Sequence, residues 1–165
     1  MTVLVSDTSV LIDLSRGGLI ELAFSLPVDL AVPDWLHERE ILPEFGKRLQ
    51  DLGLRVEELS GDATAEAQRF LLEDRSLSLA DTFALALAQD RGWTLLTGDK
   101  RLRGLAESLS VECHGVLWFL DLLEETGIAA PGVLHAGLTA IAAHPRCRLP
   151  ARHVKARLSH YSRNL

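Results

Sequence analysis

The sequence predicts one α/β domain in which helices cover a mostly parallel sheet. Runs typical of strands alternate with runs typical of helices along the chain, which is the pattern of α/β layer folds. The length of 165 residues fits a single domain, and a hydrophobic content of 47% supplies ample material for a core. The chain contains no internal repeat, low-complexity segment or clear linker.

The first two strands are short apolar runs. Residues 3–6 are predicted as a buried strand, and two helical pieces over residues 9–16 and 18–25 follow it, broken at a Gly-Gly pair. Residues 30–32 form the second predicted strand, which a proline punctuates.

The middle of the chain contains a strand between two helices. Asp34 is a good N-cap for a helix that runs through Ile41. Residues 54–59 alternate between apolar and polar side chains and are predicted as a strand. A polar helix then opens at residues 60–62 and runs to about Asp74.

The next helix has the clearest end signals. Ser78 is placed to cap a helix over residues 79–91, which is mostly Ala and Leu and is expected to be buried, and Gly92 stops it. A strand over residues 93–96 and a helix over residues 100–109 follow.

The last part of the chain is mainly helical. Residues 111–113 are a short final strand, and a leucine-rich helix begins after Gly115. Two more helices are predicted over residues 131–143 and 150–162. We interpret residues 131–165 as a C-terminal helical extension of the domain formed by residues 1–130.

The charge is unevenly distributed. The net charge is −6, yet residues 144–165 contain six basic and no acidic residues, which leaves 11 basic against 23 acidic residues in the remainder. The basic end has three open interpretations: an arm that contacts phosphates, a segment that docks on the acidic body, or the solvated face of a terminal helix.

The sequence predicts a cytoplasmic protein. No apolar stretch reaches the roughly 20 residues of a membrane span, and the N-terminus lacks the basic region of a signal peptide. Cys113 and Cys147 have no metal-ligand spacing and are expected to be unpaired thiols.

The aromatic residues do not predict a nucleic-acid surface. Trp35, Trp93 and Trp118 are expected in the core or an interface, because aromatics make up only 5% of the chain and do not alternate with basic residues. The six histidines form no pair with metal-ligand spacing on a convincing element.

Four acidic residues lie at the ends of four different predicted elements: Asp7, Glu40, Asp81 and Asp99. Asp7 and Asp99 each follow a strand, and ligands gather at the carboxyl ends of strands in such sheets. Carboxylates from distant segments repel one another unless a cation lies between them. Mg²⁺ prefers oxygen ligands, and two such ions about 3.5–4 Å apart commonly cleave phosphodiesters.

Three stretches carry a resemblance to a known family. They are Val5–Ile12 with Asp7, Leu79–Ala88 with Asp81, and Leu95–Lys100 with Asp99. In this order and spacing they resemble the PIN-domain nucleases, a family that includes the VapC-type toxin ribonucleases of toxin–antitoxin pairs. The resemblance covers roughly residues 1–125.

The resemblance implies a parallel-sheet α/β/α sandwich that cleaves RNA with Mg²⁺ or Mn²⁺. Asp7, Glu40, Asp81 and Asp99 would be the catalytic metal ligands. The residues themselves leave two interpretations for the supporting positions: Ser9 orients the site or caps a helix, and Thr97 orients the site or simply ends a strand. Lys100, Arg101 and Arg103 either contact phosphates or form a solvated helix face. A toxin of this type would act as a homodimer and be silenced by a small antitoxin protein.

The second acid has two candidates. The family places it on a helix before a Leu or Ile, about six residues after a capping residue, which selects Glu40 in front of Ile41. Glu38 points to a nearly opposite helix face and is the reserve candidate. Some relatives carry a further acid where this chain has Lys100-Arg101-Leu102-Arg103, so a second metal would be held weakly or arrive with the substrate.

Two other functions compete with the nuclease. The first is a catalytically inactive PIN-like module that binds RNA or a protein. The second is an aspartyl-phosphate enzyme or receiver domain, which is disfavoured because position 9 is Ser and no acidic pair stands at the end of the first strand.

Overall fold

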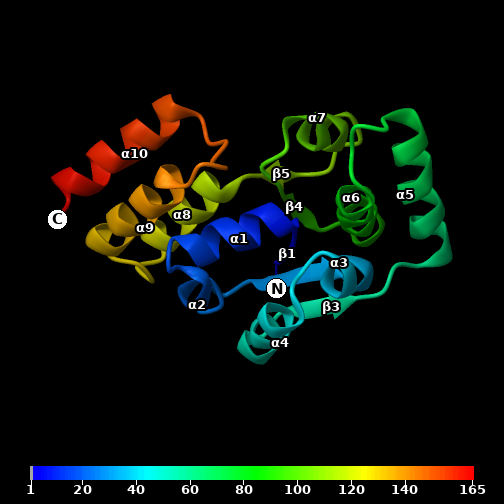
Figure 1. The fold of residues 1–165 in the computed structure, drawn as a ribbon, viewed down its shortest axis with the longest axis horizontal. Coiled ribbons are helices and arrows are strands. Elements are labelled where there is room, and N and C mark those ends of the chain that lie inside the picture. Colours follow the sequence, from blue (N-terminus) through cyan, green and yellow to red (C-terminus); the bar gives the residue numbers. More distant parts are fainter. Residues whose placement is uncertain (1) are drawn as a thin grey trace.

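The computed structural model describes residues 2–165, and its centre is a five-stranded parallel sheet (Figure 1). The strand order is β3-β2-β1-β4-β5. The strands are β1 (Val3–Ser6), β2 (Asp29–Pro33), β3 (Arg55–Glu57), β4 (Thr94–Leu96) and β5 (Cys113–His114). The prediction of an α/β fold with a mostly parallel sheet is confirmed.

The connectivity places a switch point between β1 and β4. The chain runs outward from β1 to β2 and β3, then returns to add β4 and β5 on the other side of β1. Loops that leave β1 and β4 therefore diverge from adjacent strand ends, and the crevice between them is where open parallel sheets bind ligands. Asp7 follows β1, and Asp99 lies three residues after β4.

Helices cover both faces of the sheet. They are α1 (Thr8–Arg16), α2 (Ile20–Ala23), α3 (Asp34–Arg39), α4 (Pro43–Leu52), α5 (Gly61–Glu73), α6 (Leu79–Arg91), α7 (Lys100–Ser108), α8 (Val116–Glu125), α9 (Pro131–Ala143) and α10 (Ala151–Arg163).

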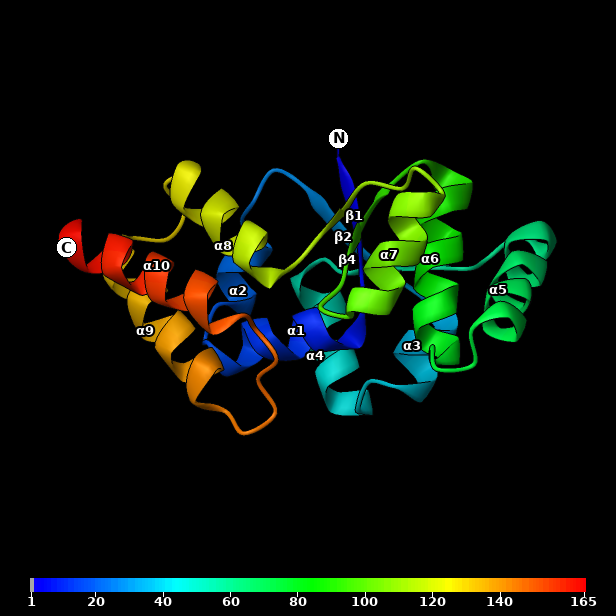
Figure 2. The same cartoon turned by 90° about the horizontal axis from the view of Figure 1, so that it is seen from above.

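Two hydrophobic cores show the three layers. Leu4 and Leu96 belong to a core shared with α1, α2, α8 and α9, whereas their neighbours Val5 and Leu95 belong to a second core shared with α5, α6 and α7. Successive strand residues point to opposite faces, so one short apolar strand supplies both cores. Figures 1 and 2 show these two groups of helices on opposite sides of β1 and β4.

The region after β2 differs most from the sequence prediction. The helix predicted through Ile41 ends at Arg39, and a separate helix, α4, which the sequence analysis missed, begins at Pro43. A proline disfavours helical backbone in the residue before it and suits the first helical position, so Pro43 both separates α3 from α4 and starts the second helix. Gly53, with φ 118°, ends α4.

The C-terminal helices pack closely on the rest of the chain. A Cβ atom on Gly137 would lie 2.9 Å from the Gly17 carbonyl oxygen, so α9 approaches the α1–α2 turn at a distance that only glycine permits. Val154 and Tyr161 of α10 are buried in the same core as Leu4. Figure 2 shows α9 and α10 side by side next to α1 and α8.

Ion pairs also attach α10. Arg157 forms a two-pronged pair with Asp121 of α8, at 2.9 and 2.7 Å, and His160 lies 2.9 Å from Glu124.

Cys113 and Cys147 are unpaired, as the sequence predicted. None of the helices formed within residues 2–165 combines the length and the apolar character that crossing a bilayer requires.

Candidate active site

A groove of about 730 Å³ lies at the carboxyl ends of β1 and β4, and all four predicted acids line it. Asp7 comes from the β1–α1 junction, Glu40 from the end of α3, Asp81 from the first turn of α6, and Asp99 from the start of α7. The structure thus brings together four carboxylates that lie up to 92 positions apart in the sequence.

Asp7 is the most tightly held of these carboxylates. It is 3% exposed. Its Oδ1 accepts hydrogen bonds from Ser9 Oγ at 2.8 Å and the Val10 amide at 2.9 Å. Its Oδ2 accepts from Thr97 Oγ1 and, at 3.3 Å, from the Gly98 amide. Four donors occupy about four acceptor sites, so the carboxylate has one fixed orientation.

Burial raises the pKa of Asp7 above its ordinary value, although the hydrogen bonds from Thr97, Val10, Ser9 and Gly98 act in the opposite direction. The negative form is therefore costly without a cation nearby.

Thr97 connects two of the acids. Its hydroxyl donates to Asp7 Oδ2 and accepts the Asp99 amide at 3.1 Å. Asp99 in turn caps α7, because its Oδ1 accepts the amides of Arg101 and Leu102 at 2.8 and 3.1 Å. Thr97 thus makes two hydrogen bonds with the acids, and Ser9 makes one hydrogen bond with Asp7. These bonds are compatible with the predicted orienting role of the two residues.

Asp81 lies at the start of a largely buried helix. Ser78 Oγ accepts the Asp81 amide at 3.0 Å and caps α6, as predicted. Burial raises the pKa of Asp81, hydrogen bonds from Ser78 lower it, and the charges of Asp7 and Asp99 raise it further. The carboxylates of Asp7 and Asp99 therefore lie close enough to Asp81 to disfavour its ionisation.

Of the two candidates for the second acid, Glu40 lines the groove, and Glu38 is not among its lining residues. Glu40 is exposed, and it stands at the C-cap of α3 rather than inside a helix as predicted. Asp34 is the first residue of α3, and its carboxylate accepts the adjacent Trp35 amide at 2.7 Å.

The carboxylate oxygens have the chemistry that Mg²⁺ or Mn²⁺ requires. Within residues 2–165, however, no three His, Cys, Asp or Glu side chains are grouped closely enough to hold one ion. Mg²⁺ commonly uses one or two carboxylates and completes its shell with waters and substrate phosphates. Asp7, Asp81 and Asp99 fit that type of site, since a cation would offset the burial and repulsion that raise the pKa values of Asp7 and Asp81.

The three basic residues after Asp99 have different surroundings. Lys100 is exposed and lines the groove. Arg101 lies 3.8 Å from Asp74 and is not a lining residue. Arg103 lines the groove and donates to the Thr97 carbonyl at 3.2 Å; a Cβ atom on Gly115 would lie 2.8 Å from its guanidinium. Arg103 therefore supports the strand end that carries Thr97.

A fifth acid, Asp13 on α1, also lines the groove and was not among the predicted site residues. Burial raises its pKa, the nearby Arg16 lowers it, and Asp7 raises it. The signal was present in the spacing, because Ser9, Asp13 and Arg16 recur every three or four residues and so share one helix face.

The C-terminal segment forms another side of the groove. Arg146, Arg148, His153 and Arg157 line it, and the three arginines are opposite in charge to the acidic cluster. The groove lining also includes Gly115 and Pro150, the N-cap residues of α8 and α10. Neither helix has a side-chain cap.

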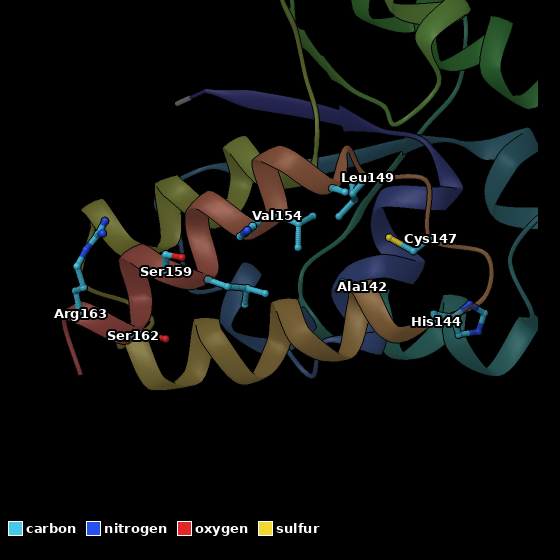
Figure 3. A pocket seen from close by; sticks show the side chains of 11 residues that line it. Ala142, His144, Cys147, Leu149, Val154, Ser159, Ser162 and Arg163 are labelled. Carbon is cyan, nitrogen blue, oxygen red and sulfur yellow. The ribbon is translucent and has the colours of Figure 1, made fainter.

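A second hollow of about 640 Å³ lies between α9 and α10 (Figure 3). Its lining includes Leu149, Val154 and Leu158, and none of its lining residues is acidic. It lacks the carboxylates that would bind a metal ion, so the acidic groove is the better candidate for an active site.

A family model described as PIN domain matches residues 3–163, from β1 to the last residue of α10. No curated protein matches the chain.

Proposed function

Because the chain belongs to the PIN-domain family, whose members are generally nucleases that use divalent metal ions, we propose that it is a metal-dependent endoribonuclease. The observation that carries the proposal is the meeting of Asp7, Asp81 and Asp99 in one groove at the switch point of the sheet. Burial and the charges of Asp7 and Asp99 raise the pKa of Asp81, which supports a site that binds a cation.

Asp81, Asp99 and Glu40 are the side chains proposed to hold Mg²⁺ or Mn²⁺ together with Asp7. Asp99 Oδ2 accepts no hydrogen bond from residues 2–165, so it faces no competing donor. Asp7 is fully engaged, and its longest hydrogen bond, 3.3 Å from the Gly98 amide, is the one most easily exchanged for a metal contact.

A divalent cation bound there would lower the pKa of water that attacks the phosphorus and offset charge on the leaving oxygen. The protein's own part is placement. Thr97 holds Asp7 and Asp99 in a fixed relation, while Lys100 is placed to contact a phosphate beside them. Arg101, which pairs with Asp74, is a weaker candidate for that role.

The test is cleavage of a mixed panel of structured RNAs with added Mg²⁺ or Mn²⁺, against EDTA and an Asp7→Asn, Asp99→Asn double variant. Metal-dependent cutting that the double variant loses is the expected result. The pair Glu40→Gln and Glu38→Gln is the matched control for the second acid: the first variant should lose most activity, and the second should keep it.

A PIN-like module that binds RNA or protein without cutting is the second candidate, favoured by the lack of a preformed three-ligand group within residues 2–165. Calorimetry with Mg²⁺ or Mn²⁺ separates the two. If the protein neither cuts RNA nor binds the metal, the nuclease hypothesis is rejected and the binding module remains.

The resemblance to VapC-type toxins motivates a narrower proposal, in which the chain is the toxin of a toxin–antitoxin pair, forms a homodimer and is silenced by a small antitoxin. Growth arrest on expression, rescued by co-expression of the adjacent gene, is the expected result. Growth unaffected by an active nuclease would contradict the toxin role.

A further inference from the structure

We propose that His114 and Trp118 form a subsite on which one base of the RNA stacks, beside the acidic residues, and that Arg146 and Arg148 hold the adjoining phosphates. The inference rests on the proposed function for its ligand class. It goes beyond that function by assigning the residues that position the strand.

The two rings are already arranged as a stack. His114 ends β5 and Trp118 lies in the first turn of α8; their ring centroids are 4.1 Å apart and their planes differ by 9°. His114 Nε2 lies 3.2 Å from Glu112 Oε1, which restrains the ring. Both rings are half-buried and both line the acidic groove. The two rings are too close to admit a base between them, so the base stacks on an outer face of the pair. Aromatic faces bind bases irrespective of sequence.

The proposed subsite departs from the sequence-based expectation that the aromatic residues form no nucleic-acid surface. Trp118 packs partly against the core, as predicted. Its stacking partner His114 stands at the end of a strand and lines the same groove as Asp7 and Asp99. Aromatic and basic residues do not alternate along the chain, so the sequence pattern misses a platform that tertiary folding assembles.

Arg146 and Arg148 supply unmatched positive charge to the same groove. Both are exposed, and neither forms an ion pair with residues 2–165, whereas Arg157 is matched by Asp121. The sequence has no acidic residue after Glu125. Guanidinium groups pair well with phosphate oxygens, and such contacts bind the backbone of any sequence.

The two features together require a strand with accessible bases. A base stacked on His114 and Trp118 must be free of a duplex, because paired bases offer no open face to a protein platform. The ligand is therefore an unpaired segment of RNA whose backbone runs along the arginine side of the groove.

The first test measures binding without cleavage, in EDTA. A fluorescent-labelled oligoadenylate of about eight nucleotides is compared with an abasic oligonucleotide of the same length and charge. Wild-type protein should bind the abasic strand about tenfold or more weakly. Equal affinity for the two strands would overturn the base subsite, and this comparison needs no variant.

The second test uses tryptophan fluorescence to determine whether Trp118 is the ring that contacts the base. Oligoadenylate should quench the protein's emission; Trp118→Phe should abolish most of the quenching, and Trp93→Phe should retain it. Trp93 is the matched control because Arg55 and Arg91 lie over its ring and it does not line the groove. Undiminished quenching in a folded Trp118→Phe variant would exclude Trp118.

The third test concerns the arginines. An Arg146→Gln, Arg148→Gln double variant should bind both oligonucleotides more weakly and show a smaller salt dependence. Arg152→Gln, an exposed charge outside the groove, should change neither. Unchanged affinity in the double variant would overturn the phosphate contacts.

These binding results are independent of cleavage. Base-dependent binding without any metal-dependent cutting would contradict the proposed nuclease and leave the subsite standing. Metal-dependent cutting together with equal binding of the abasic strand would support the nuclease and contradict the base subsite.

Discussion

Asp81 carries its charge where water solvates it incompletely and where two other carboxylates are near. Burial and the charges of Asp7 and Asp99 raise its pKa in the folded chain above the ordinary 3.8. The folded state therefore binds more protons than the unfolded state between these two pKa values, and stability falls as pH rises through that window.

We predict that Asp81→Asn is more stable than wild type in EDTA at neutral pH. The advantage should shrink as the pH falls toward the ordinary pKa of 3.8, because the Asp81 carboxyl of the folded wild type then becomes protonated. Added Mg²⁺ should stabilise the wild type more than the variant. Urea unfolding from about pH 4 to pH 8 measures this, and a difference independent of pH would contradict it.

Thr97 is a buried hydroxyl that joins Asp7 to Asp99. Removing it in Thr97→Val keeps the shape but deletes one donor to Asp7 and the acceptor for the Asp99 amide. We expect roughly a 10–100-fold loss of metal affinity or cleavage, the range for residues that orient metal ligands.

Thr94→Val is the matched control for Thr97. Thr94 is buried at the start of β4, and Thr97 directly follows the end of that strand. The Thr94 hydroxyl donates to Glu112, which is not one of the four acids. Equal losses of metal affinity and cleavage in the two variants would show that Thr97 acts only through general stability.

At the scale of elements, helix caps place the acids. Ser78 and Ser60 are exposed N-caps of α6 and α5, and each accepts the amide three residues on, at 3.0 and 3.1 Å. Only Ser78 lines the groove, because the helix it caps starts with Asp81 in its first turn.

We predict that Ser78→Ala and Ser60→Ala each reduce the free energy of unfolding by about 1 kcal/mol. Only Ser78→Ala should also lower cleavage, because the first turn of α6 sets the position of Asp81. Chemical unfolding and RNA cleavage are measured on both variants. A loss of cleavage in both would indicate a general effect of stability.

The accuracy of the predicted helix ends varies between helices. Residues 79–91 form a helix with the predicted bounds because Ser78 and Gly92 give strong local stop signals. The end of α3 was wrong because the prediction extended the helix toward Pro43, whose effect on the preceding residue was not taken into account.

At the scale of the whole molecule, α10 is joined to the core of the sheet. Tyr161 is 1% exposed, and its hydroxyl has no hydrogen-bond partner within residues 2–165. Burial, with the charges of Asp121 and Glu124, raises the pKa of Tyr161 to about 12. The ring therefore contributes by packing, and the hydroxyl adds an unpaired polar group.

We predict that Tyr161→Ala reduces the free energy of unfolding by about 3–5 kcal/mol, whereas Tyr161→Phe leaves it unchanged or raises it. Both should unfold in one cooperative transition, as expected if residues 131–165 extend the domain formed by residues 1–130. Guanidinium unfolding followed by circular dichroism tests this. A separate early transition in Tyr161→Ala would instead indicate an independent C-terminal unit.

The structure shows docking on the acidic body for one residue of the basic end, and contact with phosphates remains a proposal for two others. Arg157 docks on Asp121, while Arg146 and Arg148 line the groove without an ion pair in residues 2–165. The sequence left these interpretations open, because arginines that are close in sequence look alike until folding places different side chains next to them.

The sequence by itself predicted the parallel α/β fold and most element bounds, and it selected four acids that the structure places in one groove, because strand periodicity, caps and strand-end carboxylates are local features of the chain. Only the tertiary structure decided that Glu40 lines the groove without its reserve candidate Glu38, that Asp13 faces the same groove, and that His114 stacks on Trp118. Those facts depend on which segments meet across the sheet, and the free energy of that meeting comes from buried side chains far from the residues that it brings together.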